Sequence, residues 1–370
     1  MSWEALHSLP GSQVATAGVN RTVGSPGVLR MHVVTWNLAQ GDGIADGALT
    51  RTGALPDLLL CRDDSPGLVV VGTQETSRWD ELSQGECHTN AGISADLALQ
   101  AMRRGSPSLQ VRAAFQAQLG TGCHLLTATR AGALGLWLYC SSTLRPLVRE
   151  LRTSSHLLGV REVVNRATKG GVGASIRLRG GMSVLLINSH LPAGDGKATE
   201  RNGAYHRIKQ ALFADLAAER RAKNATNAHD VSVWMGDLNY RVRSNRSAAD
   251  RALALGMPEV LLGNDQVREG SQRGAKTRVL ATPVLDMGSM HVATPGRTLG
   301  RVCRPSQLHQ EQRHRRAYVH FREAPVAFPP TYKYDMGTHV YDTSKKSRVP
   351  SWTDRILYKP ALSITHEQIT

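Results

Sequence analysis

The sequence predicts a layered α/β fold, and three observations support this. Short apolar, β-branched runs recur along the chain, helical patterns lie between several of them, and many of the connections are not tight hairpins. The chain has 370 residues, of which 41% are hydrophobic and 20% are charged. This composition supplies enough apolar surface for a sizeable core and excludes a disordered chain. We therefore expect one large domain with additional segments attached to it.

Six runs have the length and the β-branched content of strands. In chain order they are Met31 to Leu38, Leu68 to Thr73, Leu134 to Cys140, Val172 to Leu178, Met182 to Ser189 and Val231 to Met235. The strongest helical pattern runs from Ala204 to Lys223, where Ile208, Leu212 and Leu216 share one face. Its apolar stripe is expected to pack on a sheet.

The composition of two segments predicts the bounds of the folded domain and an insertion within it. Residues 1–30 are rich in Gly, Ser, Pro and Val without periodicity, so we predict a flexible N-terminal preface before a folded domain over 31–370. Residues 272–316 have few apolar runs and many cations, which indicates a basic insertion. The insertion is either an arm that attracts anionic lipid or phosphates, or a solvated loop, and we favour the loop.

The charge balance narrows the partners. A net charge of +15 indicates polyanionic partners, which are nucleic acid, anionic membrane or phosphorylated substrates. The five cysteines lack metal-site spacing and predict neither a disulfide framework nor a zinc site. The N-terminus lacks a signal-peptide pattern, and the most apolar stretch, Ala131 to Cys140, is too short to cross a bilayer. We expect a cytoplasmic protein with peripheral contact to anionic membrane.

Candidate functional residues lie where apolar strands end in polar side chains. Asn37 and Glu75 follow two such strands, and amide and carboxylate oxygens are the ligands that Mg²⁺ prefers. His190 ends another strand and can donate to a phosphoryl oxygen. Each residue alone also has a simpler interpretation: a turn-forming Asn, a salt-bridged Glu and a core His.

Two longer segments carry more information. In VSVWMGDLNYR, Asp237 and Asn239 lie two residues apart on an extended backbone, so one can position a water while the other holds the phosphate that the water attacks. The segment from Phe328 to Lys359 places cations among rigid aromatic rings, which suits several phosphates on a small ring better than diffuse contacts to a duplex. Within it, Asp354 is a candidate to orient a catalytic imidazole.

Together these segments resemble the inositol polyphosphate 5-phosphatases. The matching elements, in the family's order and spacing, are TWN (35–37), QE (74–75), TKGGVG (168–173), SHL with RN (189–202), WMGDLNYR (234–241) and the run from PPTYKY to SWTDRIL (329–357). The resemblance covers about residues 31–360. It implies a four-layered α/β/β/α sandwich with two central mixed β-sheets, which is the fold of the endonuclease/exonuclease/phosphatase superfamily.

The resemblance also implies roles for individual residues. Asn37 and Glu75 would bind Mg²⁺, and Asp237 would orient or activate the attacking water. Asn239 and His190 would hold the scissile phosphate, and Asp354 would support the catalytic histidine. The remaining positions would contact substrate: Tyr332, Lys333, Lys346 and Arg348 at the neighbouring 4-phosphate, and Arg201, Asn202, Tyr240 and Arg241 within the site signatures.

The implied activity is Mg²⁺-dependent removal of the 5-phosphate from phosphoinositides, such as phosphatidylinositol 4,5-bisphosphate, or from soluble inositol polyphosphates. A metal and fixed cations can supply the charge neutralisation that this hydrolysis needs. A cysteine nucleophile is not indicated, because none of the five cysteines has an Arg six positions later.

Three departures from the family pattern stand out. Thr168 replaces the usual Asn, and Pro192-Ala193-Gly194 follows SHL. The chain ends at Thr370, before the further strand whose Ser-Asp-His element bears the catalytic histidine in the family, and His366 is a weak substitute. Because this histidine is missing from the given sequence, we expect catalytic turnover by this polypeptide to be impaired.

Two rival functions remain open. A nuclease-like phosphodiesterase of the same superfamily would draw on the positive charge, although the compact cluster of cations argues against nucleic acid. A phosphoinositide-binding module would bind without releasing phosphate.

Overall fold

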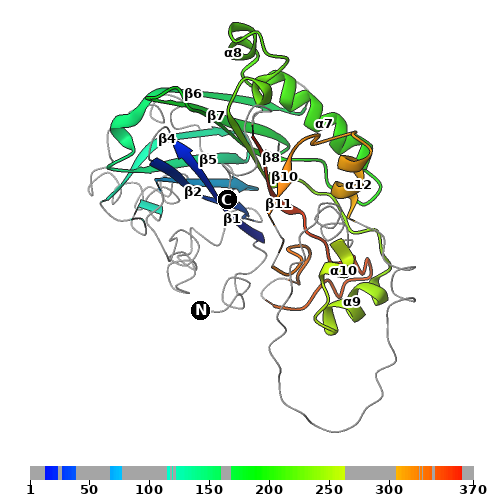
Figure 1. Ribbon diagram of the computed structural model, residues 1–370. Coiled ribbons are helices and arrows are strands. Elements are labelled where there is room, and N and C mark those ends of the chain that lie inside the picture. The colour runs from blue at the N-terminus through cyan, green and yellow to red at the C-terminus, as the bar shows by residue number, and fades with distance from the viewer. Residues whose placement is uncertain are drawn as a thin grey trace, which may run out of the picture.

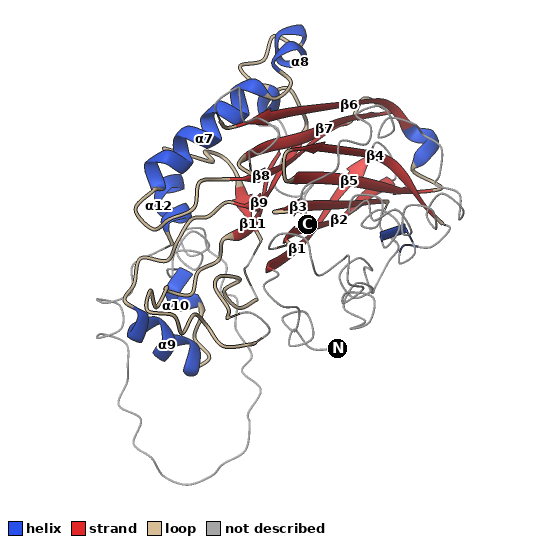
Figure 2. Ribbon diagram, turned by 180° about the vertical axis from the view of Figure 1, so that it is seen from behind, coloured by secondary structure: helices blue, strands red, loops and turns tan. Residues whose placement is uncertain are grey.

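Two mixed β-sheets packed face to face form the centre of the molecule, and helices cover the outer side of the larger sheet (Figures 1 and 2). The computed structural model describes residues 13–23, 27–38, 67–76, 115–116, 119, 122–159, 168–262, 306–324, 326, 328–335 and 338–360. The predicted α/β fold with two mixed sheets is confirmed.

The smaller sheet has five strands in the order β1-β2-β3-β5-β4. Its strands are β1 (Gln13–Val23), β2 (Gly27–Asn37), β3 (Leu68–Gln74), β4 (Cys123–Ala131) and β5 (Leu134–Ser141). β2 and β3 run parallel, and the other neighbours are antiparallel. Consequently β2 and β3 end at the same edge of the sheet.

The larger sheet has six strands in the order β10-β11-β9-β8-β7-β6. Its strands are β6 (Val148–Leu157), β7 (Gly170–Leu178), β8 (Ser183–His190), β9 (Val231–Asp237), β10 (Arg322–Glu323) and β11 (Asp354–Pro360). Only β8 and β9 are parallel, and β11 begins beside the end of β9. The edge where β8 and β9 end is therefore also the edge where β11 begins.

Alternating side chains bury both faces of the larger sheet. Val184 and Leu186 of β8 point into the core between the sheets, while Leu185 and Ile187 point to the outer helices. This is the two-residue period of a strand, and burial on both faces explains why β8 reads as an almost continuous apolar run. β9 follows the same pattern.

The outer layer is formed mainly by α7 (Ala198–Ala211) and α8 (Ala214–Glu219) (Figure 2). The sequence predicts one helix over Ala204 to Lys223, but Phe213 has φ of 55° and divides it. Because the Phe213 side chain is buried against the sheet, core packing outweighs the helical pattern here.

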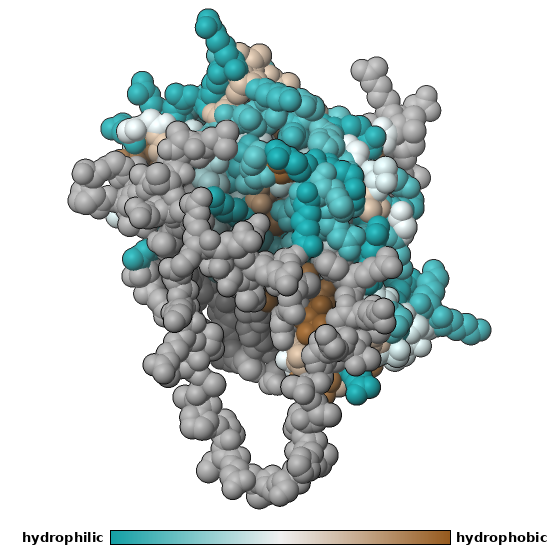
Figure 3. Space-filling model, turned by 45° about the vertical axis from the view of Figure 1, so that its right-hand side comes forward, coloured by the Kyte–Doolittle hydropathy of each residue, from teal (hydrophilic) through white to brown (hydrophobic). Residues whose placement is uncertain are grey.

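Shorter elements complete the described part of the chain. They are η2 (Arg145–Leu147), η4 (Ala225–Asn227), α9 (Arg246–Ala254), α10 (Glu259–Leu262) and α12 (Gln307–Arg313). No helix in the described ranges is long and apolar enough to cross a membrane. Most of the described surface in view in Figure 3 is hydrophilic.

Two predicted boundaries need correction. Within the segment 1–30, predicted to be flexible, residues 13–23 form β1, which pairs along its whole length with β2. Backbone pairing requires no apolar periodicity, so no periodic pattern marked this strand. Within 272–316, residues 307–313 form α12, which buries Gln307 and Glu311 beside Leu308. A helix that buries polar side chains lacks the apolar spacing used to find helices. Residues 272–305 and His366 lie outside the described residues.

Candidate active site

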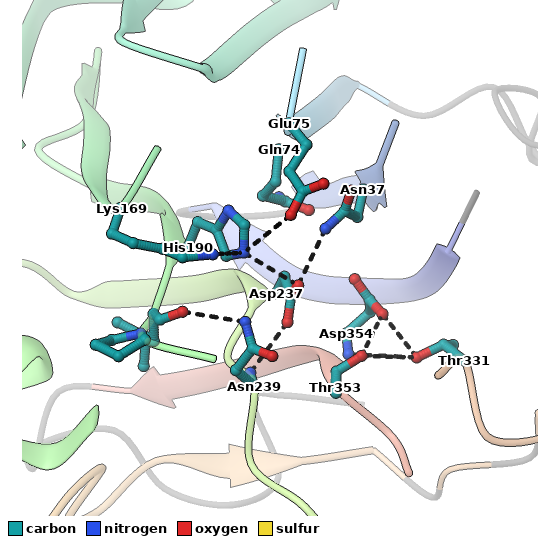
Figure 4. A network of polar contacts seen from close by, with 12 residues as sticks. Asn37, Gln74, Glu75, Lys169, His190, Asp237, Asn239, Thr331, Thr353 and Asp354 are labelled. Carbon is teal, nitrogen blue, oxygen red and sulfur yellow. Dashed lines mark hydrogen bonds and ion pairs between the residues drawn. The ribbon is translucent and has the colours of Figure 1, made fainter. Parts of the chain in front are cut away.

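Three strand pairings bring the predicted site residues together. His190 and Asp237 are in register at the ends of the parallel strands β8 and β9, and Asp354 pairs with Asp237 at the start of β11. In the other sheet, Asn37 ends β2 beside Gln74 of β3, and Glu75 follows directly. Figure 4 shows these side chains converging from the two sheets.

Special backbone conformations shape this edge. Gly236 has φ of 134°, and a Cβ atom there would lie 1.9 Å from the Ser189 carbonyl oxygen of the neighbouring strand. Only glycine therefore allows β8 and β9 to approach so closely just before Asp237. Glu75 and Asn239 have φ of 51° and 56°, so two further site residues adopt the left-handed conformation.

Asp237 lies at the centre of the site. Its Oδ2 atom accepts a hydrogen bond from Asn37 Nδ2 at 3.0 Å and lies 3.2 Å from His190 Nε2, while Oδ1 accepts from the Asn239 backbone N–H at 3.1 Å. Burial acts to raise the pKa of Asp237, but His190, Lys169 and Arg241 outweigh it and hold the pKa well below its usual range. The carboxylate is ionised at neutral pH.

One nitrogen of His190 faces both signs of charge. His190 Nε2 lies 3.2 Å from the Asp237 carboxylate and 3.8 Å from Glu75 Oε1, and it also contacts the Lys169 ammonium. Nε2 can donate to Asp237 only with a proton and can accept from Lys169 only without one. Burial lowers the pKa of Lys169, although Asp237 and Glu75 act in the opposite direction.

Asp354 is fully buried beside Asp237. Its Oδ2 atom accepts hydrogen bonds from Thr331 Oγ1 at 2.6 Å and Thr353 Oγ1 at 2.9 Å, whereas Oδ1 has no protein partner. Burial and then the charge of Asp237 raise the pKa of Asp354 well above its usual range. The pKa values of the two adjacent carboxyl groups are therefore shifted in opposite directions.

Asn239 and Arg241 extend the site beyond β9. Asn239 Nδ2 donates to the Leu191 carbonyl at 3.0 Å, and its Oδ1 accepts from Arg241 Nη2 at 2.5 Å. The Arg241 guanidinium stacks 3.6 Å from the centroid of the Tyr332 ring, and its Nε and Nη1 atoms have no protein partner. A buried cation with free donors is suited to an anionic ligand.

Three predicted substrate-binding residues are buried behind the site. Arg201 donates to the carbonyls of Pro192 at 3.1 Å and Gly194 at 2.7 Å. Asn202 accepts from the Tyr240 hydroxyl at 2.7 Å and also donates to Glu311. These contacts brace the loop after β8 and the start of α7, and direct contact of the three side chains with substrate stays a prediction.

Gln307 ties the site loops together. Its Oε1 atom accepts from the Arg241 backbone N–H at 3.2 Å and from the Arg201 guanidinium, and its Nε2 donates to the Asp195 carbonyl at 2.9 Å. The loops after β8 and β9 thus share one buried amide. Gln307 is absent from the predicted site residues because it lies inside the predicted insertion.

The predicted 4-phosphate residues lie on two adjoining segments. Tyr332 and Lys333 belong to one, and Lys346 and Arg348 belong to the other. The segments are joined by a bond from the Asp342 N–H to the Lys333 carbonyl at 2.9 Å. Tyr332 joins this surface to the site through its stacking on Arg241.

Two other contributors were missed. Lys169 lies in the quoted TKGGVG element but was not selected. Asn188 of β8 accepts from Gln74 Nε2 at 2.6 Å and donates to the carbonyls of Thr73 and Gly135, which links the sheets directly behind the site. An Asn directly after the apolar run of a predicted strand was the available signal for Asn188, since a buried amide needs partners.

The side-chain oxygen atoms of Asn37, Glu75 and Asp237 are of the kind that a hard cation prefers. Among the described residues, no three His, Cys, Asp or Glu side chains form a preformed metal site. Asn37 and Glu75 nevertheless converge beside Asp237 (Figure 4), and a carboxylate and an amide completed by water or phosphate oxygens are typical of Mg²⁺. Asn37 and Glu75 are thus the residues that would hold the ion.

A comparison with known protein families identifies the family of this chain. Residues 34–281 and 290–369 match the model of the endonuclease/exonuclease/phosphatase family 2. The chain belongs to this family. Within it, the curated relatives confirm the resemblance to inositol polyphosphate 5-phosphatases.

Two relatives illustrate this similarity. The chain is 28% identical over 243 residues to inositol-1,4,5-trisphosphate 5-phosphatase 1 of Schizosaccharomyces pombe, covering 66% of this chain and 18% of that protein. It is 30% identical over 251 residues to human phosphatidylinositol polyphosphate 5-phosphatase type IV, covering 66% of this chain and 33% of that protein. The chain therefore spans only a third or less of the length of these family members.

Solved structures of two proteins share the fold. The inositol polyphosphate 5-phosphatase domain of a synaptojanin, in complex with inositol (1,4)-bisphosphate and a calcium ion, has a TM-score of 0.55 and 22% identity, covering 94% of this chain and 78% of that one. A ferrous nitric oxide complex of a Cimex nitrophorin mutant has a TM-score of 0.55 and 18% identity, covering 96% and 90%. The fold thus occurs in proteins with different chemistry, so the function depends on the site.

Proposed function

We propose that the chain is a Mg²⁺-dependent phosphomonoesterase that removes the 5-phosphate from inositol polyphosphates or phosphoinositides. The observation that carries this proposal is the convergence of Asn37, Glu75, His190, Asp237 and Asp354 at one edge of the two sheets (Figure 4). The family membership and the named activities of the relatives support the same function.

The charges of the site support binding of a phosphate. Lys169, His190 and Arg241 supply donors around Asp237, and a phosphate oxygen placed among them would accept hydrogen bonds that the protein leaves incomplete. Such fixed donors stabilise the charge that develops on the phosphoryl group without reorganising during the reaction. They favour phosphoryl transfer over acyl or glycosyl transfer.

The ionised Asp237 is suited to act on the attacking water. Its carboxylate is fixed by Asn37 and by the Asn239 backbone N–H, so its position is set before substrate arrives. A carboxylate in this position can orient a water and accept its proton. Asn239, held by Leu191 and Arg241, is placed to hold the phosphate beside that water.

Mg²⁺ bound by Asn37 and Glu75 would supply charge neutralisation to the scissile phosphate. The neighbouring cations Lys333, Lys346 and Arg348 would then select a substrate with a second phosphate next to the one removed. Peripheral contact with anionic membrane and a cytoplasmic location belong to the proposal, because phosphoinositide headgroups lie at such a surface.

Phosphate release by the purified chain tests this function. We expect release from inositol 1,4,5-trisphosphate and from short-chain phosphatidylinositol 4,5-bisphosphate with Mg²⁺, and none after chelation with EDTA. Asp237→Asn should lower kcat about 100-fold or more, because general-base contributions are of this size. Asp215→Asn, at an exposed position of α8, serves as the matched control and should retain full activity.

Other outcomes would contradict the proposal. Release that persists in EDTA, or equal rates for Asp237→Asn and the unmodified chain, would contradict the mechanism. Salt-sensitive cleavage of DNA or RNA would favour the alternative function, a nuclease-like phosphodiesterase. Tight binding of inositol 1,4-bisphosphate by a chain that releases no phosphate would favour the binding module.

A further inference from the structure

Arg246, the first residue of α9, makes contacts that neither the motifs nor the site account for. Its guanidinium donates to three backbone carbonyls of one segment, Asp342 at 2.6 Å, Tyr341 at 3.0 Å and Arg348 at 3.2 Å. Its Nε atom donates to the Asp250 carboxylate at 2.7 and 2.9 Å. One side chain thus joins α9 to both ends of residues 341–348, which lie next to the helix (Figure 1).

Asp342 organises the same segment from inside. Its carboxylate accepts from the Arg348 N–H and from Arg348 Nη1, both at 3.0 Å, and from the Ser344 N–H at 3.2 Å. Its own N–H donates to the Lys333 carbonyl at 2.9 Å. We call residues 341–348 the basic loop, since Lys345, Lys346 and Arg348 lie within it.

Ring stacking holds one end of the basic loop, where Tyr341 lies 4.3 Å from Tyr334 between ring centroids. Residues 343–347 are exposed, and three cations within four positions repel one another. Hydrogen bonds to carbonyls fix the backbone, while Lys345 and Lys346 stay exposed and Arg348 pairs with Asp342. A planar guanidinium can serve three carbonyls at once, whereas a lysine ammonium on a flexible stem cannot reproduce that fork.

We propose that Arg246 is a positioning residue that sets the shape of the basic loop and thereby the recognition of a phosphate adjacent to the scissile one. The proposal rests on the proposed function for the identity of the ligand. Arg246 touches neither substrate nor reacting atoms in this proposal. It acts through the backbone on which Lys346 and Arg348 are carried.

The first test measures the loop without using activity. In hydrogen exchange followed by mass spectrometry, peptides covering residues 341–348 should exchange about 10-fold faster in Arg246→Ala, because loss of about 1.4 kcal/mol of hydrogen bonding corresponds to that factor. Arg246→Lys should fall between. Arg251→Ala, at an exposed position of the same helix, is the matched control and should not change exchange in the loop.

The second test measures recognition. In Arg246→Ala, affinity for inositol 1,4-bisphosphate by calorimetry should fall about 10-fold, the same free-energy change, while affinity for inositol 1-phosphate stays unchanged. KM for phosphatidylinositol 4,5-bisphosphate should rise by a similar factor, with kcat within twofold. A merely structural role would lower both affinities or kcat together.

The two tests separate failure of this inference from failure of the proposed function. Unchanged exchange in the loop of Arg246→Ala overturns the inference whatever the activity. Faster exchange with equal loss of affinity for both inositol phosphates overturns the role in recognition. Absence of phosphate release by the unmodified chain overturns the proposed function alone. The role of Arg246 is still tested by hydrogen exchange in the basic loop and by affinity for the two inositol phosphates.

Discussion

Lys169 shows how a single side chain can set the electrostatics of this site. Its ammonium contacts His190 and lies near the carboxylates of Asp237 and Glu75. Burial lowers the pKa of Lys169, while those carboxylates favour its charged form. A partly desolvated cation beside the predicted phosphate site interacts with an anion more strongly than an exposed lysine does.

Replacement of Lys169 is therefore expected to weaken catalysis. Lys169→Met keeps the length of the side chain and removes its charge, and loss of a charge-assisted hydrogen bond of about 2–3 kcal/mol should lower kcat/KM by about 30- to 160-fold. Initial rates of phosphate release measure the effect. Lys223→Met removes an exposed lysine after α8 and is the control; equal losses in the two variants would show that net charge, rather than Lys169, matters.

The sequence predicted some site residues better than others, for a physical reason. Asn37, His190 and Asp237 end apolar strands, so polarity at an abrupt boundary marked them. Lys169 precedes a glycine-rich strand and meets His190 only because β7 and β8 pair with Gly170 opposite His190. Such a contact depends on strand register, which local sequence does not specify.

At the scale of elements, the close approach of β8 and β9 determines where the predicted catalytic side chains lie. Gly236 is followed by Asp237, and its neighbour Ser189 is followed by His190 in the parallel strand. The space for a side chain at Gly236 is filled by the Ser189 backbone. The distance between His190 and Asp237 is thus set by a residue that has no side chain.

Gly236→Ala should separate these strands. The added Cβ would need a conformation unfavourable for alanine and would meet the Ser189 carbonyl, so we expect the free energy of unfolding to fall by at least about 3 kcal/mol. Gly203→Ala is the matched control, because that glycine lies inside α7 with open space around it and should stabilise by about 0.5–1 kcal/mol. Urea unfolding measures both, and a neutral Gly236→Ala would contradict the close packing.

Elements were predictable where burial was continuous. β3, β5, β8 and β9 bury nearly every residue, and the sequence predicted all four. β4 and β6 were missed, because most of their residues are only partly buried and β6 carries the polar run VRELRTSSHL. An edge strand needs only backbone partners on one side, so its side chains carry a weak signal.

At the scale of the whole molecule, the site exists only when the two sheets are correctly docked. Asn37 and Glu75 come from the smaller sheet, whereas His190, Asp237 and Asp354 come from the larger one. Asn188 reaches across this junction to Gln74 and to the carbonyls of Thr73 and Gly135. Its amide is buried, so each of these bonds is formed away from water.

Asn188→Ala should destabilise the sheet junction. Several buried partners lose their bonds at once, and we expect the free energy of unfolding to fall by about 2–4 kcal/mol, with kcat reduced under conditions where the protein remains folded. Asn245→Ala is the comparison, since it removes the cap of α9 and an exposed bond from the Ser247 hydroxyl, and it should cost about 1 kcal/mol. Thermal and urea unfolding measure both variants, and an Asn188 effect no larger than that of Asn245 would contradict a special role at the junction.

The bond between Asn37 and Asp237 joins residues 200 positions apart along the chain. A ribosome makes these two residues at well-separated times, and Asp354 is made later still. During synthesis the early strands must therefore wait for the late ones before any cation or phosphate finds a complete set of partners. The group of side chains drawn from both sheets is therefore complete only after β11 has been synthesised and has paired with β9.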